Sequence, residues 1–123
     1  MSKTVLEIGN CNADHAFIKH MLESNFDVNV VRAHKLDDAA KALEDHEVSL
    51  IMINRLLDVD GTEGMDVFRE LAAASESKIP TMMITNFEEH QQAAIDAGAV
   101  RGFGKAALNS EETLDSIREA LSD

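Results

Sequence analysis

The segment Val48–Asn54, with the sequence VSLIMIN, decides which class of fold this chain adopts. It is an almost unbroken apolar run of strand length, and it ends on the polar residue Asn54. Strands with apolar side chains on both faces are typical of parallel sheets that helices cover on both sides. An acidic, glycine-containing stretch, RLLDVDGTEG, follows directly. The strand therefore delivers Asn54 to a loop at one edge of the expected sheet.

Short apolar runs alternate with longer amphipathic segments on both sides of this strand. This alternation, strand then helix five times over, predicts an α/β fold. In that fold a doubly wound, five-stranded parallel sheet lies between two layers of helices as a three-layer sandwich, and we expect a single domain over residues 1–123. The expected strands are 4–9, 26–33, 48–54, 80–85 and 100–104, and the expected helices are 12–25, 35–46, 64–75, 87–98 and 109–122.

Composition excludes several classes of partner. The net charge is −12, from 23 acidic and 11 basic residues, and such a surface repels the phosphates of nucleic acids. No apolar stretch approaches the roughly 20 residues that are needed to span a bilayer, and the N-terminus does not resemble a signal peptide. Cys11 is the single cysteine, which is typical of a reducing compartment. We expect a cytoplasmic protein that binds neither nucleic acid nor membrane.

Polar residues follow four of the expected strands. In a parallel sheet, the loops after the carboxyl ends of the strands gather at one edge and form the binding site. The residues at these ends are Gly9 and Asn10 after the first strand, Asn54 after the third, Thr85 after the fourth and Lys105 after the fifth. We expect these five residues to form the functional site.

These positions resemble the receiver domain of two-component response regulators, and the resemblance covers essentially the whole chain. It implies the flavodoxin-like fold of the single-domain chemotaxis response regulator. Receivers carry an acidic pair after the first strand, a phosphoacceptor aspartate after the third, a serine or threonine after the fourth and a lysine after the fifth. Here TMMIT places Thr85 at the hydroxyl position, and DAGAVRGFGKAAL places Lys105 at the lysine position. The resemblance implies phosphorelay signalling with a protein partner, either a histidine kinase or a downstream output protein.

Two departures from the receiver pattern affect the expected chemistry. LEIGN puts Gly9 and Asn10 where the acidic pair should be, and IMIN puts Asn54 at the phosphoacceptor position. An amide is a poor nucleophile, and Mg²⁺ prefers carboxylate oxygens. The missing acidic pair favours a naturally degenerate site over an engineered change at Asn54. We therefore expect a degenerate phosphorylation pocket that holds no metal or cofactor, in a protein that is not an enzyme.

The two polar residues at the centre of this pocket allow alternative interpretations. Asn54 is either a strand-end residue whose hydrogen bonds its own loop satisfies, or a fixed mimic of one signalling state that bonds to Thr85 or Lys105. Without a phosphoryl group, Lys105 pairs with Asp58 or Asp60, or points into solvent. Thr85 is expected to make only local hydrogen bonds.

The leading functional hypothesis is a degenerate receiver that acts through protein–protein contact. Its expected partner-binding face spans residues 87–121 and includes Phe87, His90, Gln91 and Phe103. One alternative is a receiver that accepts the phosphoryl group on a displaced carboxylate such as Asp58. Another is a small-ligand or calcium-binding module that uses Asp58, Asp60 and Glu63, although their spacing does not fit an EF-hand loop.

Overall fold

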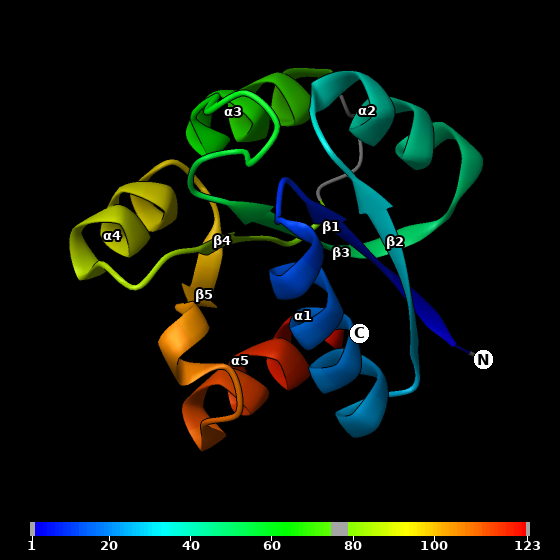
Figure 1. Cartoon of the computed structure of the whole chain (residues 1–123), viewed down its shortest axis with the longest axis vertical. Helices are drawn as coiled ribbons and strands as arrows, with labels where there is room; N and C mark the ends of the chain where they lie inside the picture. Colours follow the sequence, from blue (N-terminus) through cyan, green and yellow to red (C-terminus); the bar gives the residue numbers. More distant parts are fainter. Residues whose placement is uncertain (1, 75–78, 123) are drawn as a thin grey trace.

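The computed structural model describes residues 2–74 and 79–122. It contains one five-stranded parallel sheet with the strand order β2-β1-β3-β4-β5, covered by five α-helices (Figure 1). This arrangement confirms the predicted doubly wound α/β fold. None of the described helices is both long and apolar enough to cross a membrane.

The elements lie close to the predicted positions. The helix expected over 64–75 is described as far as Ala74, and Ser75 falls outside the described residues. A short 3-10 helix, Lys105–Ala107, follows the last strand. The strands are β1 Lys3–Ile8, β2 Val28–Ala33, β3 Val48–Asn54, β4 Thr81–Ile84 and β5 Val100–Phe103, and the helices are α1 Asn12–Asn25, α2 Leu36–Asp45, α3 Gly64–Ala74, α4 Glu88–Asp96 and α5 Glu111–Leu121.

Two apolar cores form, one on each face of the sheet. Successive side chains of a strand point to opposite faces, so Leu6 and Ile8 of β1 join the core beneath α2, α3 and α4, whereas Val5 joins the core beneath α1 and α5. Figure 1 shows these two groups of helices on opposite sides of the sheet. The apolar run of β3 fills both cores, as its sequence predicts.

The parallel register brings the carboxyl ends of the strands to one edge of the sheet. Ile8 of β1 lies opposite Ile53 of β3, and Asn54 lies opposite Ile84 of β4. Ile84 in turn lies opposite Phe103 of β5. The residues that follow β1, β3, β4 and β5 therefore meet at this edge.

Candidate functional site

A shallow cleft of about 190 Å³ lies where β3, β4 and β5 end. The structure brings three of the five expected site residues together here, because Asn54, Thr85 and Lys105 all line the cleft. The remaining lining residues are Arg55, Leu56, Ile84, Asn86 and Phe87. We call this the strand-end cleft.

Gly9 closes one side of the site through its backbone. Its carbonyl oxygen accepts hydrogen bonds from the Asn54 side-chain amide at 3.2 Å and from the Asp58 backbone N–H at 2.9 Å. Its φ of 85° lies in the left-handed region that favours glycine. A Cβ atom at this position would also lie 2.8 Å from the Leu57 Cγ. A side chain at this position, which matches an acidic residue in receivers, would therefore require Leu57 to shift.

Asn54 is held by its own loop and by the end of β1. Its Nδ2 donates to the Leu56 carbonyl at 2.8 Å as well as to Gly9. Among the described residues, its side chain bonds to neither Thr85 nor Lys105. This geometry supports the interpretation of Asn54 as a strand-end residue whose bonds are satisfied locally. Both bonds need an amide, because a carboxylate cannot donate to two carbonyl oxygens.

Lys105 pairs with Asp14 of α1, and the expectation of Asp58 or Asp60 as its partner was wrong. The Nζ of Lys105 lies 2.7 Å from the Asp14 Oδ2, and both side chains are about one-third exposed. The hydrogen bond from Lys105 holds the pKa of Asp14 below its ordinary value, and a hydrogen bond from the Cys11 thiol acts in the same direction. Partial burial opposes this shift without cancelling it.

Thr85 and the loop after β3 are both organised by local hydrogen bonds. The buried Thr85 hydroxyl oxygen accepts from the Phe87 backbone N–H at 3.3 Å. Residues 55–64 fold into a short hairpin, because Leu56 and Glu63 form an antiparallel bridge. Asp58 and Asp60 are exposed on this hairpin. Within residues 2–74 and 79–122, no three acidic, histidine or cysteine residues are placed to share a metal ion.

Asn10 does not face the cleft. It is 1% exposed and turns beneath α1, where its Nδ2 donates to Glu7 Oε2 at 2.6 Å. His15 Nδ1 contacts the other oxygen of Glu7, and an Arg32 N–H donates to the Asn10 carbonyl at 2.9 Å. We call Glu7, Asn10, His15 and Arg32 the buried polar cluster.

Glu7 was not recognised as a site residue from the sequence, although a signal was present. It is fully buried in β1, the strand that lies between β2 and β3. A carboxylate in the middle of a central strand must find partners inside the protein, because an isolated buried charge is very costly. Its position in TVLEIG therefore predicts a buried polar contact, without naming the partner.

The expected partner-binding face is smaller than the sequence indicated. Gln91 and Phe103 are 3% and 4% exposed, so neither can contribute to a surface, and their assignment to this face was wrong. The Gln91 amide donates to the Met83 carbonyl at 3.0 Å and accepts from the Gly102 N–H at 2.9 Å, which ties α4 to β4 and β5. Phe103 points into the core beneath α1 and α5.

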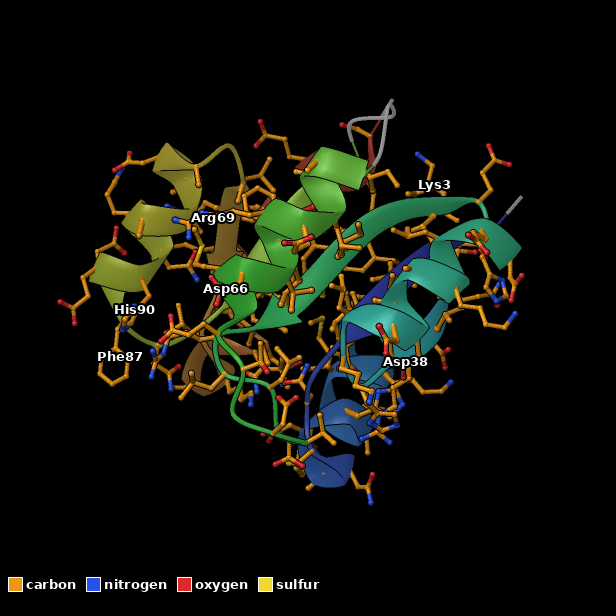
Figure 2. All side chains as sticks on the ribbon, turned by 90° about the horizontal axis from the view of Figure 1, so that it is seen from above. Lys3, Asp38, Asp66, Arg69, Phe87 and His90 are labelled. Atoms are coloured by element: carbon orange, nitrogen blue, oxygen red, sulfur yellow. The ribbon has the colours of Figure 1, made fainter. Side chains whose placement is uncertain are left out.

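Phe87 and His90 do lie at the surface. Phe87 is 58% exposed, and the His90 ring meets it edge-on at 5.9 Å between ring centres. Figure 2 shows both rings at the outer end of α4, away from the core. Val100 is a further exposed apolar residue, but it lies at the start of β5, at the opposite edge of the sheet from Phe87.

The chain is similar to solved receiver domains. No protein-family profile matches it, and no curated protein sequence does. The structure of NtrX from Brucella abortus superposes with a TM-score of 0.83 at 19% identity, over 98% of this chain and 28% of that chain. The CheY-like response regulator receiver domain from Methylobacillus flagellatus gives 0.78 at 17% identity, over 99% and 100% of the two chains.

A third solved structure extends the same likeness. The CheY-like receiver domain from Methanospirillum hungatei JF-1 gives a TM-score of 0.76 at 20% identity, over 98% of this chain and 94% of that one. The chain has the receiver-domain fold. This chain thus spans a little over a quarter of the NtrX chain, but nearly all of the two single-domain structures.

Proposed function

We propose that this protein is a degenerate receiver that works in two-component-type signal transduction by binding a protein partner, without phosphorylation of an aspartate and without enzymatic activity. Its fold and the positions of Asn54, Thr85 and Lys105 support a receiver origin. The chemistry at those positions supports the loss of phosphoryl transfer.

The hydrogen bonds of Asn54 carry this proposal. Its amide donates to the carbonyls of Gly9 and Leu56, so the residue at the phosphoacceptor position is bound to backbone rather than exposed as a nucleophile. An acidic side chain at Gly9 would collide with Leu57 and meet an unfavourable φ, and Asn10 turns away beneath α1. The strand-end cleft thus lacks the carboxylates that Mg²⁺ would need at these positions.

The state of Lys105 agrees with this interpretation. In receivers, the matching lysine neutralises the phosphoryl group. Here the Lys105 ammonium is bound to Asp14 at 2.7 Å, which gives it an internal anion in place of an external one. A phosphoryl group would have to compete with this pair.

The partner that we propose is a histidine kinase or a downstream output protein, met in the cytoplasm through the outer side of α4 and β5. Phe87 and His90 provide exposed aromatic surface at the start of α4, and Val100 adds exposed apolar surface at the start of β5. Exposed apolar patches on soluble domains often mark interaction sites, and aromatic residues commonly dominate their binding energy.

Beryllofluoride with Mg²⁺, followed by amide NMR, tests the loss of phosphorylation. We expect no saturable shifts at Asn54 or Lys105, while a phosphorylatable receiver in the same buffer responds. Asn54→Asp should not restore the response, because its carboxylate would face the Gly9 and Leu56 carbonyls and still lack an acidic pair. Saturable shifts at this cleft, or a hydroxylamine-labile phosphoryl adduct on Asp58 after acetyl phosphate treatment, would contradict the proposal.

Paired phenylalanine variants test the proposed partner surface. Phe87→Ala should greatly weaken capture of the partner from the native cell. Phe17→Ala is the matched control, because Phe17 is a similarly exposed ring (64%) on α1. Equal capture by both variants would exclude the outer side of α4 as the contact surface, and circular dichroism would show that each variant is folded.

A further inference from the structure

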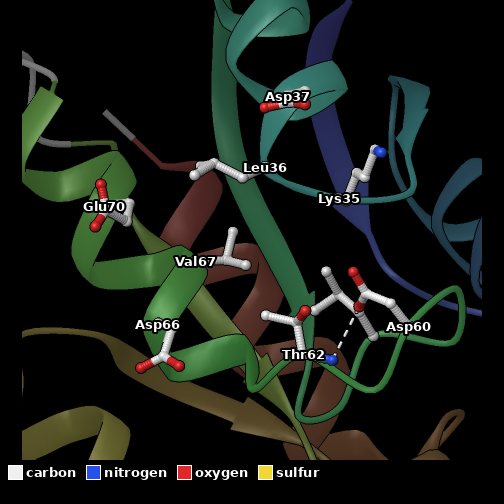
Figure 3. Close-up of a pocket in the computed structure, with 9 residues that line it drawn as sticks. Lys35, Leu36, Asp37, Asp60, Thr62, Asp66, Val67 and Glu70 are labelled. Atoms are coloured by element: carbon white, nitrogen blue, oxygen red, sulfur yellow. Dashed lines mark hydrogen bonds between the residues drawn. The ribbon is translucent and has the colours of Figure 1, made fainter.

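A second cleft, of about 170 Å³, lies between the start of α2 and α3 and is closed at one end by the loop after β3 (Figure 3). It is separate from the strand-end cleft, because the two clefts share no lining residue. Leu57, from the loop after β3, contributes to its floor. We call it the acidic cleft. Its lining residues are Lys35, Leu36, Asp37, Leu57, Asp60, Thr62, Asp66, Val67 and Glu70.

The floor of the acidic cleft is apolar. Leu36 of α2 and Val67 of α3 face one another across it (Figure 3), and Leu57 lies in the adjoining core. Small-molecule pockets usually enclose about 300 Å³ or more. The acidic cleft is smaller, so its size fits one long side chain of a partner better than a complete small ligand.

Carboxylates from three elements surround this floor. Asp37 belongs to α2, Asp60 to the loop after β3, and Asp66 and Glu70 to α3. In the part of the chain that the structure describes, the carboxylates of Asp37 and Glu70 make no hydrogen bond or ion pair, so they remain available to a ligand.

The other charges leave this excess of acid in place. Asp66 makes a loose ion pair with Arg69 at 3.8 Å. Asp60 accepts from the Thr62 N–H at 2.9 Å, and hydrogen bonding to Thr62 lowers the pKa of Asp60. Lys35 is the one cation among the lining residues. Four carboxylates against one cation, on a chain of net charge −12, favour a cationic occupant.

The wall of the cleft is formed in advance. The Gly61 N–H donates to the Leu57 carbonyl at 2.7 Å, and the Leu57 N–H donates to the Thr62 carbonyl at 2.8 Å. These bonds, together with the Asp60–Thr62 bond, fix the loop that carries Asp60. A preformed wall lowers the conformational entropy that binding would otherwise cost.

We propose that the acidic cleft binds an arginine side chain presented by a basic segment of a protein partner. The aliphatic stem of the arginine packs between Leu36 and Val67, since such stems bury well against apolar surface. Its guanidinium donates to the carboxylates of the rim. Arginine suits the cleft better than lysine, because its planar, weakly hydrated head can bond two carboxylate oxygens at once.

This inference goes beyond the proposed signalling role, because it concerns a different surface from the outer side of α4. A degenerate receiver could use either surface or both. Failure of one test therefore leaves the other intact.

Amide NMR titration with defined peptides tests the proposal. The probe is a short acetylated and amidated peptide of alanine, leucine and arginine, and the comparison peptide has lysine in place of each arginine. We expect saturable shifts centred on Leu36, Thr62 and Val67, with the lysine peptide binding more weakly. Shifts centred on Phe87 and Lys105, or no saturable shifts, would overturn the proposal.

Two charge-matched double variants separate the cleft from general electrostatics. Asp37→Asn with Glu70→Gln should weaken binding of the arginine peptide by about threefold to tenfold, the range expected for two partly exposed ion pairs. Asp45→Asn with Glu47→Gln removes the same charge from exposed positions outside the cleft, and should leave binding nearly unchanged. Equal weakening by both double variants would mean that net charge alone attracts the peptide, which would overturn the proposal.

Discussion

Two polar regions at the same edge of the sheet have opposite characters. The strand-end cleft is open to solvent, and its lining contains the cations Arg55 and Lys105 with no carboxylate. The buried polar cluster lies beneath α1, and there the carboxylate of Glu7 is fully enclosed. The two regions meet along the chain at two neighbouring residues. The Gly9 carbonyl accepts a hydrogen bond from Asn54 of the cleft, and the Asn10 side chain donates to Glu7 of the cluster.

The difference concerns the hydrogen-bond partners of the acidic and amide side chains at this edge. The resemblance to receivers implies an acidic pair after β1, which would suit a divalent cation. Here the carboxylate of β1 points inward and binds Asn10 and His15, while the amide of Asn54 binds backbone. The side chains of Glu7, Asn10 and Asn54 at this edge therefore bond to groups within the protein. Variants in each region test this difference.

The largest effect is expected in the buried polar cluster. Glu7→Ala removes the acceptor for Asn10 and His15 and leaves a small cavity, so we expect the free energy of unfolding to fall by about 3–5 kcal/mol. Glu7→Gln keeps the shape and one acceptor oxygen, and should cost about 1–2 kcal/mol. Urea denaturation monitored by circular dichroism measures both values.

Glu44→Ala is the control for this prediction. Glu44 is exposed on α2, and its replacement should change stability by no more than about 0.5 kcal/mol. If Glu7→Ala costs as little as Glu44→Ala, the buried polar cluster does not stabilise the fold, and the contrast between the two regions is lost.

A smaller loss is expected on the cleft side, at Gly9. Gly9→Ala meets both the strain of a φ of 85° and a contact of 2.8 Å with the Leu57 Cγ. We expect a loss of about 2–4 kcal/mol in the free energy of unfolding. Thermal or urea unfolding would measure it, with amide NMR showing whether the loop at Asn54 moves.

Gly61→Ala is the control that separates backbone strain from the contact with Leu57. Gly61 has a similar φ of 74°, but its position opens onto free space. This variant should lose only the backbone term, about 1–2 kcal/mol. Equal losses at the two glycines would show that Leu57 can move aside, so that the position after β1 has room for a side chain after all.

The sequence predicts the fold and the edge that carries the site for a clear physical reason. The apolar runs VSLIMIN and TMMIT can be buried only between two layers of helices, and parallel topology then places Asn54, Thr85 and Lys105 at one edge. These conclusions need only local patterns and chain connectivity. They do not depend on how individual side chains are oriented.

Contacts that depend on the exact packing of distant elements could not be derived in the same way. Lys105 pairs with Asp14, a residue 91 positions away, because the first turn of α1 and the residue after β5 meet at the same edge of the sheet. Gln91 is polar, yet it satisfies backbone groups of β4 and β5 from inside the protein. Its position three residues before the buried Ala94 is a helical spacing that indicates an inward side chain.

The smallest effect is expected at the Asp14–Lys105 ion pair, whose side chains are more exposed than those of Glu7 and His15. Because Lys105 lowers the pKa of Asp14 in the folded state, the pair stabilises the fold above the ordinary aspartate value of 3.8. This contribution is lost as the pH falls through the lowered folded pKa. Both side chains are about one-third exposed, so solvent screening limits it to under about 1 kcal/mol.

Lys105→Met should therefore reduce the free energy of unfolding slightly near neutral pH, and the difference from the unchanged protein should disappear as the pH falls through the lowered pKa of Asp14. Lys41→Met is the control, because Lys41 lies 3.6 Å from Asp45 and both side chains are more exposed. It should have almost no effect at any pH. A loss at Lys105 that persists in acid would mean that its aliphatic stem, rather than its charge, stabilises the fold. The Asp14–Lys105 contact would then depend on packing, as the buried polar cluster does. The strand-end cleft and the buried polar cluster would differ only in the sign of their charge.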